Sequence, residues 1–223
     1  MSVRPPLDLA ILISGRGSNM AAIARACREG HLNARVRLVL SDRPDAAGLQ
    51  VAHGLGIGVR TVAWRGPSAR AAFERELEQA LETAQPQLLV LAGFMRVLSR
   101  RFVAARAGSI VNIHPSLLPN YPGLHTHERV LAAGERDHGA TVHFVTAELD
   151  AGPAVLQSKI AVHAGESAER LSARVQATEH IIYPRVIGWL ADGRLTWRED
   201  RPWLDGRPLL EPIVEEFGED NRN

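Results

Sequence analysis

The chain has 223 residues, 45% of them apolar, which is enough to bury the core of one domain but too few for two full domains. Its 26 basic residues are offset by 25 acidic ones, so it lacks the excess positive charge typical of nucleic-acid binding. No segment reaches the roughly 18 apolar residues of a membrane span, and the N-terminus lacks the apolar run of a secretory signal. We therefore expect a cytoplasmic protein with no membrane or nucleic-acid partner.

Short aliphatic runs alternate with helical patterns through the first half of the chain. Strands of the kind buried on both faces of a parallel sheet are predicted at residues 7–14, 35–42, 58–64, 87–93 and 109–115. Helical periodicity covers residues 19–30, 45–56 and 68–84. This alternation predicts an α/β fold with right-handed crossovers and a doubly wound, mostly parallel sheet.

The pattern changes in the last third of the chain. Residues 139–146 and 153–162 alternate like strands around the turn ELDAGP, which predicts an antiparallel extension of the sheet. A long helix is predicted from Ser167 to Ala191, followed by a hairpin in WREDRPWLDGRPLL. The polar tail after about residue 212 is expected to be frayed, and residues 1–223 are expected to form one domain.

Cysteine and histidine spacing gives no metal site. Cys27 is the one cysteine, which excludes an internal disulfide and a cysteine-based zinc site, and its helical context predicts a small buried hydrophobe. His125 and His127 are two residues apart, with no third ligand implied. We therefore predict that the protein holds no metal.

The first strand leads through SGRGSN, residues 14–19, into a helix. Gly15 and Gly17 allow a tight turn, and the helix N-terminus offers free N–H groups and a positive dipole to an anion. A Walker motif is excluded because its lysine is missing, and Met20 occupies the third glycine position of a dinucleotide fingerprint. A single phosphate on Gly17, Ser18 and Asn19 fits better, and a plain strand-to-helix connection is the alternative.

A second polar group lies in NIHPSLLP, residues 112–119. Strand alternation places Asn112 and His114 on one face, and Asp150 in the ELDAGP turn could complete a catalytic set. An imidazole moves protons near neutral pH, a carboxylate orients it, and an amide donor can stabilise an oxyanion. No hydroxyl or thiol nucleophile stands out, which favours direct attack by a substrate amine. The alternative is a histidine satisfied by its surroundings beside an ordinary turn.

Six segments over nearly the whole chain carry a resemblance: ISGRGSN, LAGFMRVLS, NIHPSLLPNYPGLHTH, GATVHFVTAELDAGPAVLQ, ARVQATEHIIYPRVI and DGRL. In this order they resemble the phosphoribosylglycinamide formyltransferase family, the folate-dependent formyltransferases of purine synthesis. The resemblance implies a Rossmann-like formyltransferase fold. It also implies an N-terminal half that binds the ribonucleotide and a C-terminal half that binds folate, in a monomer or homodimer.

The resemblance implies a role for each predicted site residue. The amine of glycinamide ribonucleotide attacks the formyl carbon of the co-substrate 10-formyltetrahydrofolate, and Asn112 steadies the oxyanion. His114 handles protons, and Asp150 supports His114 and an ordered water. The implied contacts of the ribonucleotide, from its phosphate to its ribose, are Gly17, Ser18, Asn19, Gln176 and Glu179.

Folate contacts are implied along two segments and at one arginine: Arg70 at the glutamate tail, then Met95, Arg96, Val97, Leu98 and Val145, with the 146–150 turn. If the resemblance is set aside, the alternative for Met95, Val97 and Leu98 is a place in the core. Glu179 would then lie on a solvated helix face, and Arg70 would pair with Glu74. The resemblance further implies a cis Leu118–Pro119 peptide bond. No chemistry is assigned to His125, His127 or His143.

Three other functions share part of these features. Methionyl-tRNA formyltransferase has the same catalytic set but an extra RNA-binding domain. Formyltetrahydrofolate deformylase has an N-terminal regulatory domain, whereas this chain starts on its first predicted strand. A non-catalytic nucleotide-binding module needs SGRGSN but has no use for Asn112, His114 and Asp150 together.

Overall fold

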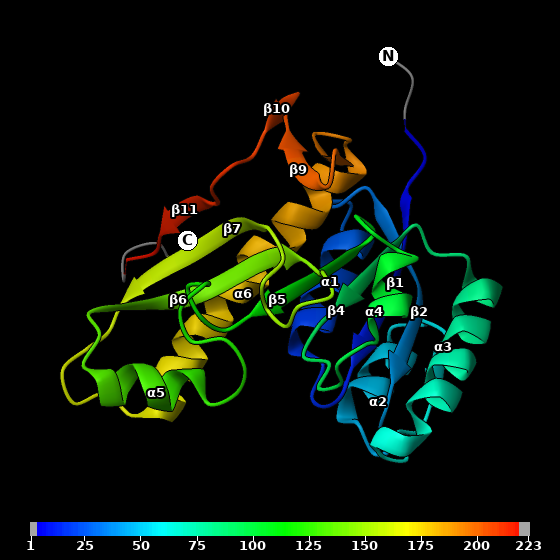
Figure 1. The fold of residues 1–223 in the computed structure, drawn as a ribbon, viewed down its shortest axis with the longest axis horizontal. Helices are drawn as coiled ribbons and strands as arrows, with labels where there is room; N and C mark the ends of the chain where they lie inside the picture. The colour runs from blue at the N-terminus through cyan, green and yellow to red at the C-terminus, as the bar shows by residue number, and fades with distance from the viewer. Residues whose placement is uncertain (1–3, 219–223) are drawn as a thin grey trace.

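The computed structural model describes residues 4–218, and its centre is one mixed sheet of eight strands (Figure 1). The order across the sheet is β11-β7-β6-β5-β4-β1-β2-β3. Their bounds are β1 Leu7–Ile13, β2 Ala34–Ser41, β3 Val59–Thr61, β4 Leu88–Leu91, β5 Ile110–His114, β6 Asp137–Phe144, β7 Ala154–Ala161 and β11 Ile213–Glu216. Strands β1 to β5 pair in parallel, which confirms the doubly wound arrangement.

Helices cover both faces of this sheet. They are α1 Ser18–Arg28, α2 Ala47–Gly54, α3 Arg70–Ala84, α4 Arg100–Ala104, α5 Thr126–Ala133 and α6 Ala168–Ala191, with a 3₁₀ turn at Pro67–Ala69. Alternate β1 residues point to opposite faces: Ile11 belongs to the core cluster that includes residues of α1, α2, α5 and α6, and Leu12 to the one that includes residues of α3 and α4. The strand run is therefore apolar on both sides, as predicted.

The antiparallel extension predicted at the end of the sheet is confirmed. Strand β6 pairs antiparallel with both β5 and β7. A separate three-stranded antiparallel sheet follows α6, with β8 Leu195–Arg198, β9 Arg201–Leu204 and β10 Arg207–Pro208. Its first turn places Glu199 and Asp200 at φ 51° and 56°, the left-handed conformation of a tight hairpin turn.

The expectation that the tail frays after about residue 212 is wrong for residues 213–216. These residues form β11, which lies parallel to β7 at the edge of the sheet. Main-chain pairing with β7 and packing of Ile213 and Phe217 against the core hold this strand. Ion pairs add to it: Glu215 pairs with Arg185 of α6, and Glu216 lies 2.7 Å from the Lys159 amine of β7. The part of the predicted tail at 219–223 lies outside the described residues.

Cys27 is half-buried on α1 and packs against the core, close to the predicted role of a small hydrophobe. Burial raises the pKa of its thiol to about 11, so at neutral pH the nucleophilic thiolate is scarce. Across residues 4–218, no helix is both long enough and apolar enough to span a lipid bilayer.

Candidate active site

The carboxyl ends of β1, β4 and β5 open into a cleft of about 920 Å³. Asn112 and His114 from β5 both line it, as expected for residues two apart on one strand face. Asp150, from the loop after β6, lines the same cleft. The structure therefore brings together the three residues predicted as a catalytic set.

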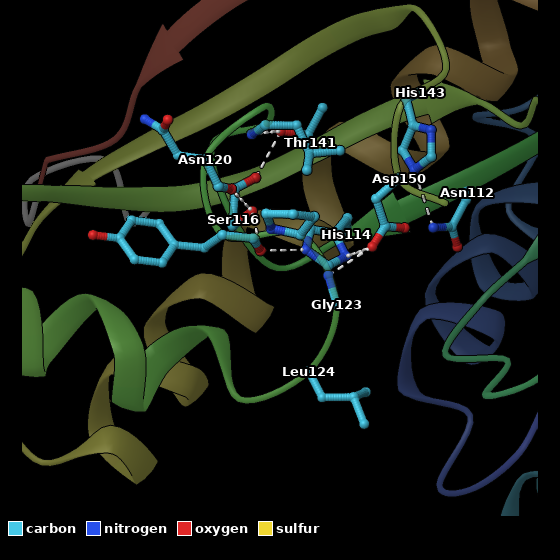
Figure 2. A network of polar contacts seen from close by, with 12 residues as sticks. Asn112, His114, Ser116, Asn120, Gly123, Leu124, Thr141, His143 and Asp150 are labelled. Atoms are coloured by element: carbon cyan, nitrogen blue, oxygen red, sulfur yellow. Dashed lines mark hydrogen bonds and ion pairs between the residues drawn. The ribbon is translucent and has the colours of Figure 1, made fainter. Parts of the chain in front are cut away.

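His114 is buried and held from two sides (Figure 2). Its Nε2 lies 2.9 Å from the Tyr121 carbonyl oxygen; because a carbonyl only accepts, Nε2 carries a proton. Its Nδ1 lies 3.5 Å from Asp150 Oδ2, an oxygen that also accepts from the Gly123 N–H at 2.9 Å. The imidazole thus has one nitrogen committed to the loop and one facing a carboxylate.

Two buried hydroxyl groups hold the loop that carries the Tyr121 carbonyl. The Ser116 hydroxyl lies 2.6 Å from the Asn120 carbonyl and 3.2 Å from that of Tyr121. The Thr141 hydroxyl donates to the Ser116 carbonyl at 2.6 Å. Tyr121 has φ 55°, an uncommon left-handed conformation, and the Leu118–Pro119 bond is cis, as expected. The Tyr121 carbonyl that faces His114 is therefore held in place by the hydrogen bonds of Ser116 and Thr141.

Asn112 contacts a histidine on the neighbouring strand. Its amide nitrogen lies 3.1 Å from His143 Nε2, and His143 Nδ1 lies 2.9 Å from the Phe144 carbonyl oxygen. Figure 2 shows the two side chains adjacent, with His143 projecting from β6. No chemistry was predicted for His143, because its pairing with Asn112 depends on the register between β5 and β6.

The phosphate-binding candidates lie at the start of α1. Gly17 has φ 71°, and a Cβ there would lie 2.9 Å from the Cα of Gly48, so this position requires glycine. Asn19 donates through Nδ2 to Glu179 Oε2 of α6 at 2.7 Å, while its own Oδ1 is buried without a partner among the described residues. Ser18, Gln176 and Glu179 line the cleft beside them.

Most of the predicted folate contacts line the cleft or a recess beside it. Met95 and Val97 line the cleft with 58% and 52% of their surface exposed. A side recess of about 90 Å³ continues from there, lined by Arg96, Val97, Leu98, Val145, Asn112 and Asp150. The cleft and the recess therefore meet at the catalytic set.

Two arginines among the predicted folate contacts differ in placement. The Arg96 Nε donates to Asp42 Oδ2 at 2.6 Å, so that its terminal nitrogens remain available at the cleft. Arg70 begins α3 and lies outside both recesses. Glu74, its alternative partner, instead accepts from the backbone N–H and the hydroxyl of Ser99, each at 2.6 Å.

Three further histidines lie at or near α5, and two of them contact each other. His125 precedes that helix with an exposed side chain, and His127 Nδ1 lies 2.9 Å from His138 Nε2. Within residues 4–218, no three histidine, cysteine or acidic side chains gather closely enough to hold a metal ion.

The sequence profile described as "Formyl transferase" matches residues 7–187. The chain belongs to this formyltransferase family. It is 50% identical over 203 residues to the phosphoribosylglycinamide formyltransferase of Escherichia coli strain K12, an alignment covering 91% of this chain and 96% of that protein.

Solved structures agree with this assignment. The phosphoribosylglycinamide formyltransferase of Coxiella burnetii gives a TM-score of 0.87 at 44% identity, covering 93% of this chain and 99% of that one. A formyltetrahydrofolate deformylase from Pseudomonas putida KT2440 gives 0.82 at 26% identity, covering 92% and 72%. The chain is thus a formyltransferase enzyme whose Rossmann-like fold it shares with both.

Proposed function

We propose that this formyltransferase transfers the formyl group of 10-formyltetrahydrofolate to the amine of glycinamide ribonucleotide, a step of purine synthesis. One observation carries the proposal: Asn112, His114 and Asp150 lie where a loop suited to phosphate meets an apolar recess. Support for the acceptor comes from the 50% identity to a phosphoribosylglycinamide formyltransferase over 96% of its length.

The ribonucleotide occupies the α1 end of the cleft in this proposal. The backbone N–H groups at Gly17, Ser18 and Asn19 point out of the N-terminus of an 11-residue helix, which favours an anion. The buried Glu179 carboxylate and the orphan Asn19 Oδ1 supply acceptors for the hydroxyl groups of a ribose.

The folate occupies the other end. The exposed Met95 and Val97 side chains and the recess with Leu98 and Val145 suit a flat, largely apolar ring system. Arg96 suits an acidic group, because Asp42 takes only its Nε and leaves the terminal nitrogens. The same logic extends to Arg70 and the glutamate tail, although Arg70 lies outside the two recesses.

Bound 10-formyltetrahydrofolate supplies the formyl carbon at which the amine forms its new C–N bond. Asn112 donates an amide N–H to the formyl oxygen as that oxygen becomes negative. The His114–Asp150 pair takes the proton that the amine loses and delivers it to the folate nitrogen as the old C–N bond breaks. The carboxylate of Asp150 stabilises the imidazolium formed between these steps.

The test follows tetrahydrofolate release with and without glycinamide ribonucleotide. Release should require the ribonucleotide, and His114→Ala should lower kcat by about 10²–10⁴-fold because proton transfer is lost. The control is His31→Ala, the same change at a side chain 75% exposed outside the cleft, which should leave kcat unchanged. Release without the ribonucleotide would indicate a deformylase, and near-normal turnover of His114→Ala would exclude the proposed catalytic set.

A further inference from the structure

We infer that His143 is the residue that orients the Asn112 amide, by presenting a hydrogen-bond acceptor to the amide nitrogen. The inference rests on the proposed function, because it assigns Asn112 the donor role at the formyl oxygen. His143 is thus a positioning residue that acts through Asn112. The assignment follows from which nitrogen of the imidazole carries a proton.

The proton of His143 is located by its backbone partner. The Phe144 carbonyl oxygen, 2.9 Å from Nδ1, can only accept, so Nδ1 is the donor. A neutral imidazole with a proton on Nδ1 offers Nε2 as an acceptor. His143 is only 2% exposed, and this burial is the main cause that lowers its pKa; His114 adds to the effect, and the Phe144 carbonyl and Asp150 oppose it. The second nitrogen therefore remains unprotonated at neutral pH.

An acceptor at His143 Nε2 fixes which way the amide of Asn112 points. The Asn112 atom 3.1 Å away is its nitrogen, which donates one of two N–H groups. A rotation of the amide by 180° would bring two acceptors face to face in a buried site, an arrangement that loses the hydrogen bond and desolvates both groups. Only one of the two amide orientations is thus compatible with a neutral His143.

Strand geometry holds the ring in place. Asn112 and His143 are direct partners in the antiparallel pairing of β5 with β6. On its other side, β6 has a register shift against β7 between Val142 and His143. Such a bulge re-aims the side chain next to it, which is its common use beside active sites.

The orientation matters at the cleft because both residues border the same recess. One amide N–H of Asn112 goes to His143, and the other remains for the oxygen of a bound formyl group. A flipped amide would place its own carbonyl oxygen near that site and repel the developing negative charge. His143 thereby decides whether Asn112 is a donor or an acceptor in the reaction.

Two substitutions separate the acceptor from the rest of the ring. His143→Gln can place an oxygen near the position of Nε2, whereas His143→Asn reaches only as far as Nδ1. We expect His143→Gln to keep kcat within about threefold, and His143→Asn to lower it about tenfold or more. Complete loss of an oxyanion donor lowers kcat by about 10²–10³-fold, and a misoriented donor should lose part of that effect. KM should stay within about threefold for both substrates, because the amide acts on the transition state.

A double-mutant cycle tests whether the effect passes through Asn112. In an Asn112→Ala background, His143→Asn should lower kcat by less than about twofold, since coupled residues are non-additive. Full additivity, equal losses in the Gln and Asn variants, or near-normal kcat in His143→Asn would each overturn the inference. Near-normal turnover of Asn112→Ala alone would overturn the proposed function as well.

A measurement on the unaltered enzyme is independent of any folding defect in the variants. Nitrogen-15 NMR of histidine rings distinguishes a protonated from an unprotonated nitrogen in each imidazole. The expected signal at pH 7 is a neutral His143 with the proton on Nδ1. A His143 ring with its proton on Nε2, or with protons on both nitrogens, would refute the inference.

Discussion

The buried carboxyl group of Glu179 lowers the stability of the fold when it is ionised. Glu179 is 7% exposed, and burial raises the pKa of its carboxyl above the ordinary value, against the opposing hydrogen bond from Asn19. A raised pKa means that the folded state prefers the protonated form, so the ionised form weakens the fold as pH rises through that pKa. Binding sites often keep such groups, because a bound ligand supplies the hydrogen-bond partners that the buried carboxylate lacks in the free protein.

The first prediction at this scale concerns Glu179→Gln. The neutral amide removes the buried charge, so the variant should melt at a higher temperature than the parent at pH 8. The difference should shrink as the pH falls through the raised pKa of Glu179, because the parent then becomes neutral too. Thermal unfolding at several pH values measures this, with Glu82→Gln at an exposed position of α3 as the control. Equal melting temperatures at pH 8 would contradict it.

At the level of single residues, the sequence predicts the candidate catalytic side chains but not the groups that hydrogen-bond to them. Strand alternation places Asn112 and His114 on one face, and the turn after the next predicted strand supplies Asp150; the structure brings all three to one cleft. His143 and the Tyr121 carbonyl were missed, because both depend on contacts fixed only by strand register and loop path. A polar residue on an apolar strand was the one available signal for His143.

At the scale of elements, helix α6 supports the strand ends that carry the site. Tyr183 of α6 is fully buried, and its hydroxyl lies 3.0 Å from the carbonyl oxygens of both Leu91 in β4 and Val111 in β5. Val111 directly precedes Asn112. The hydroxyl thus joins a helix to the two strands between which the cleft opens.

Tyr183→Phe should therefore destabilise the protein by about 1–3 kcal/mol, the usual cost of leaving buried polar groups without a donor. Urea unfolding measures the change. Tyr121→Phe serves as the control, because it removes the same atom from an exposed hydrogen bond with Glu135 and should change stability by less than about 0.5 kcal/mol. A loss no larger than that of the control would argue against the proposed support.

Element lengths explain which parts of the fold could be predicted. Helix α6 was predicted to within one residue, because apolar positions recur over 24 residues and Ser167 caps its N-terminus. Helix α4 was missed, since five residues are too few to establish a period. Helix α5 was also missed, although α2, which has the same length of eight residues, was predicted. Strand β11 was missed because its pairing with β7, its packing on the core and its ion pairs are all tertiary contacts.

For the molecule as a whole, buried histidines contribute to the loss of stability in acid. Burial lowers the pKa of His127, His138 and His143, and that of His138 falls to about 4. The unfolded chain takes up protons near pH 6.5 at these positions, while the folded protein does not. Their stabilising effect is therefore complete above pH 6.5 and is lost as the pH falls toward 4.

His138→Gln should flatten this response. The substitution keeps a polar group beside His127 but removes the titration, which corresponds to roughly 3 kcal/mol between pH 6.5 and 4 at about 1.4 kcal/mol per pKa unit. Free energies of unfolding measured across that range should depend less on pH in the variant than in the parent. His53→Gln, at an exposed position of α2, should leave the slope unchanged. An unchanged slope in His138→Gln would contradict the assignment.

The ion pair between Lys159 and Glu216 lies at a position useful for chemical labelling. Lys159 is the one lysine among the 223 residues, and it lies on β7, separated from β1 and the SGRGSN loop by β6, β5 and β4. Reagents that acylate lysine can therefore attach a dye or a sensor surface to a single side chain and leave the cleft open. Because Glu216 raises the pKa of the Lys159 amine, such coupling calls for an alkaline buffer, with enough salt to loosen the pair.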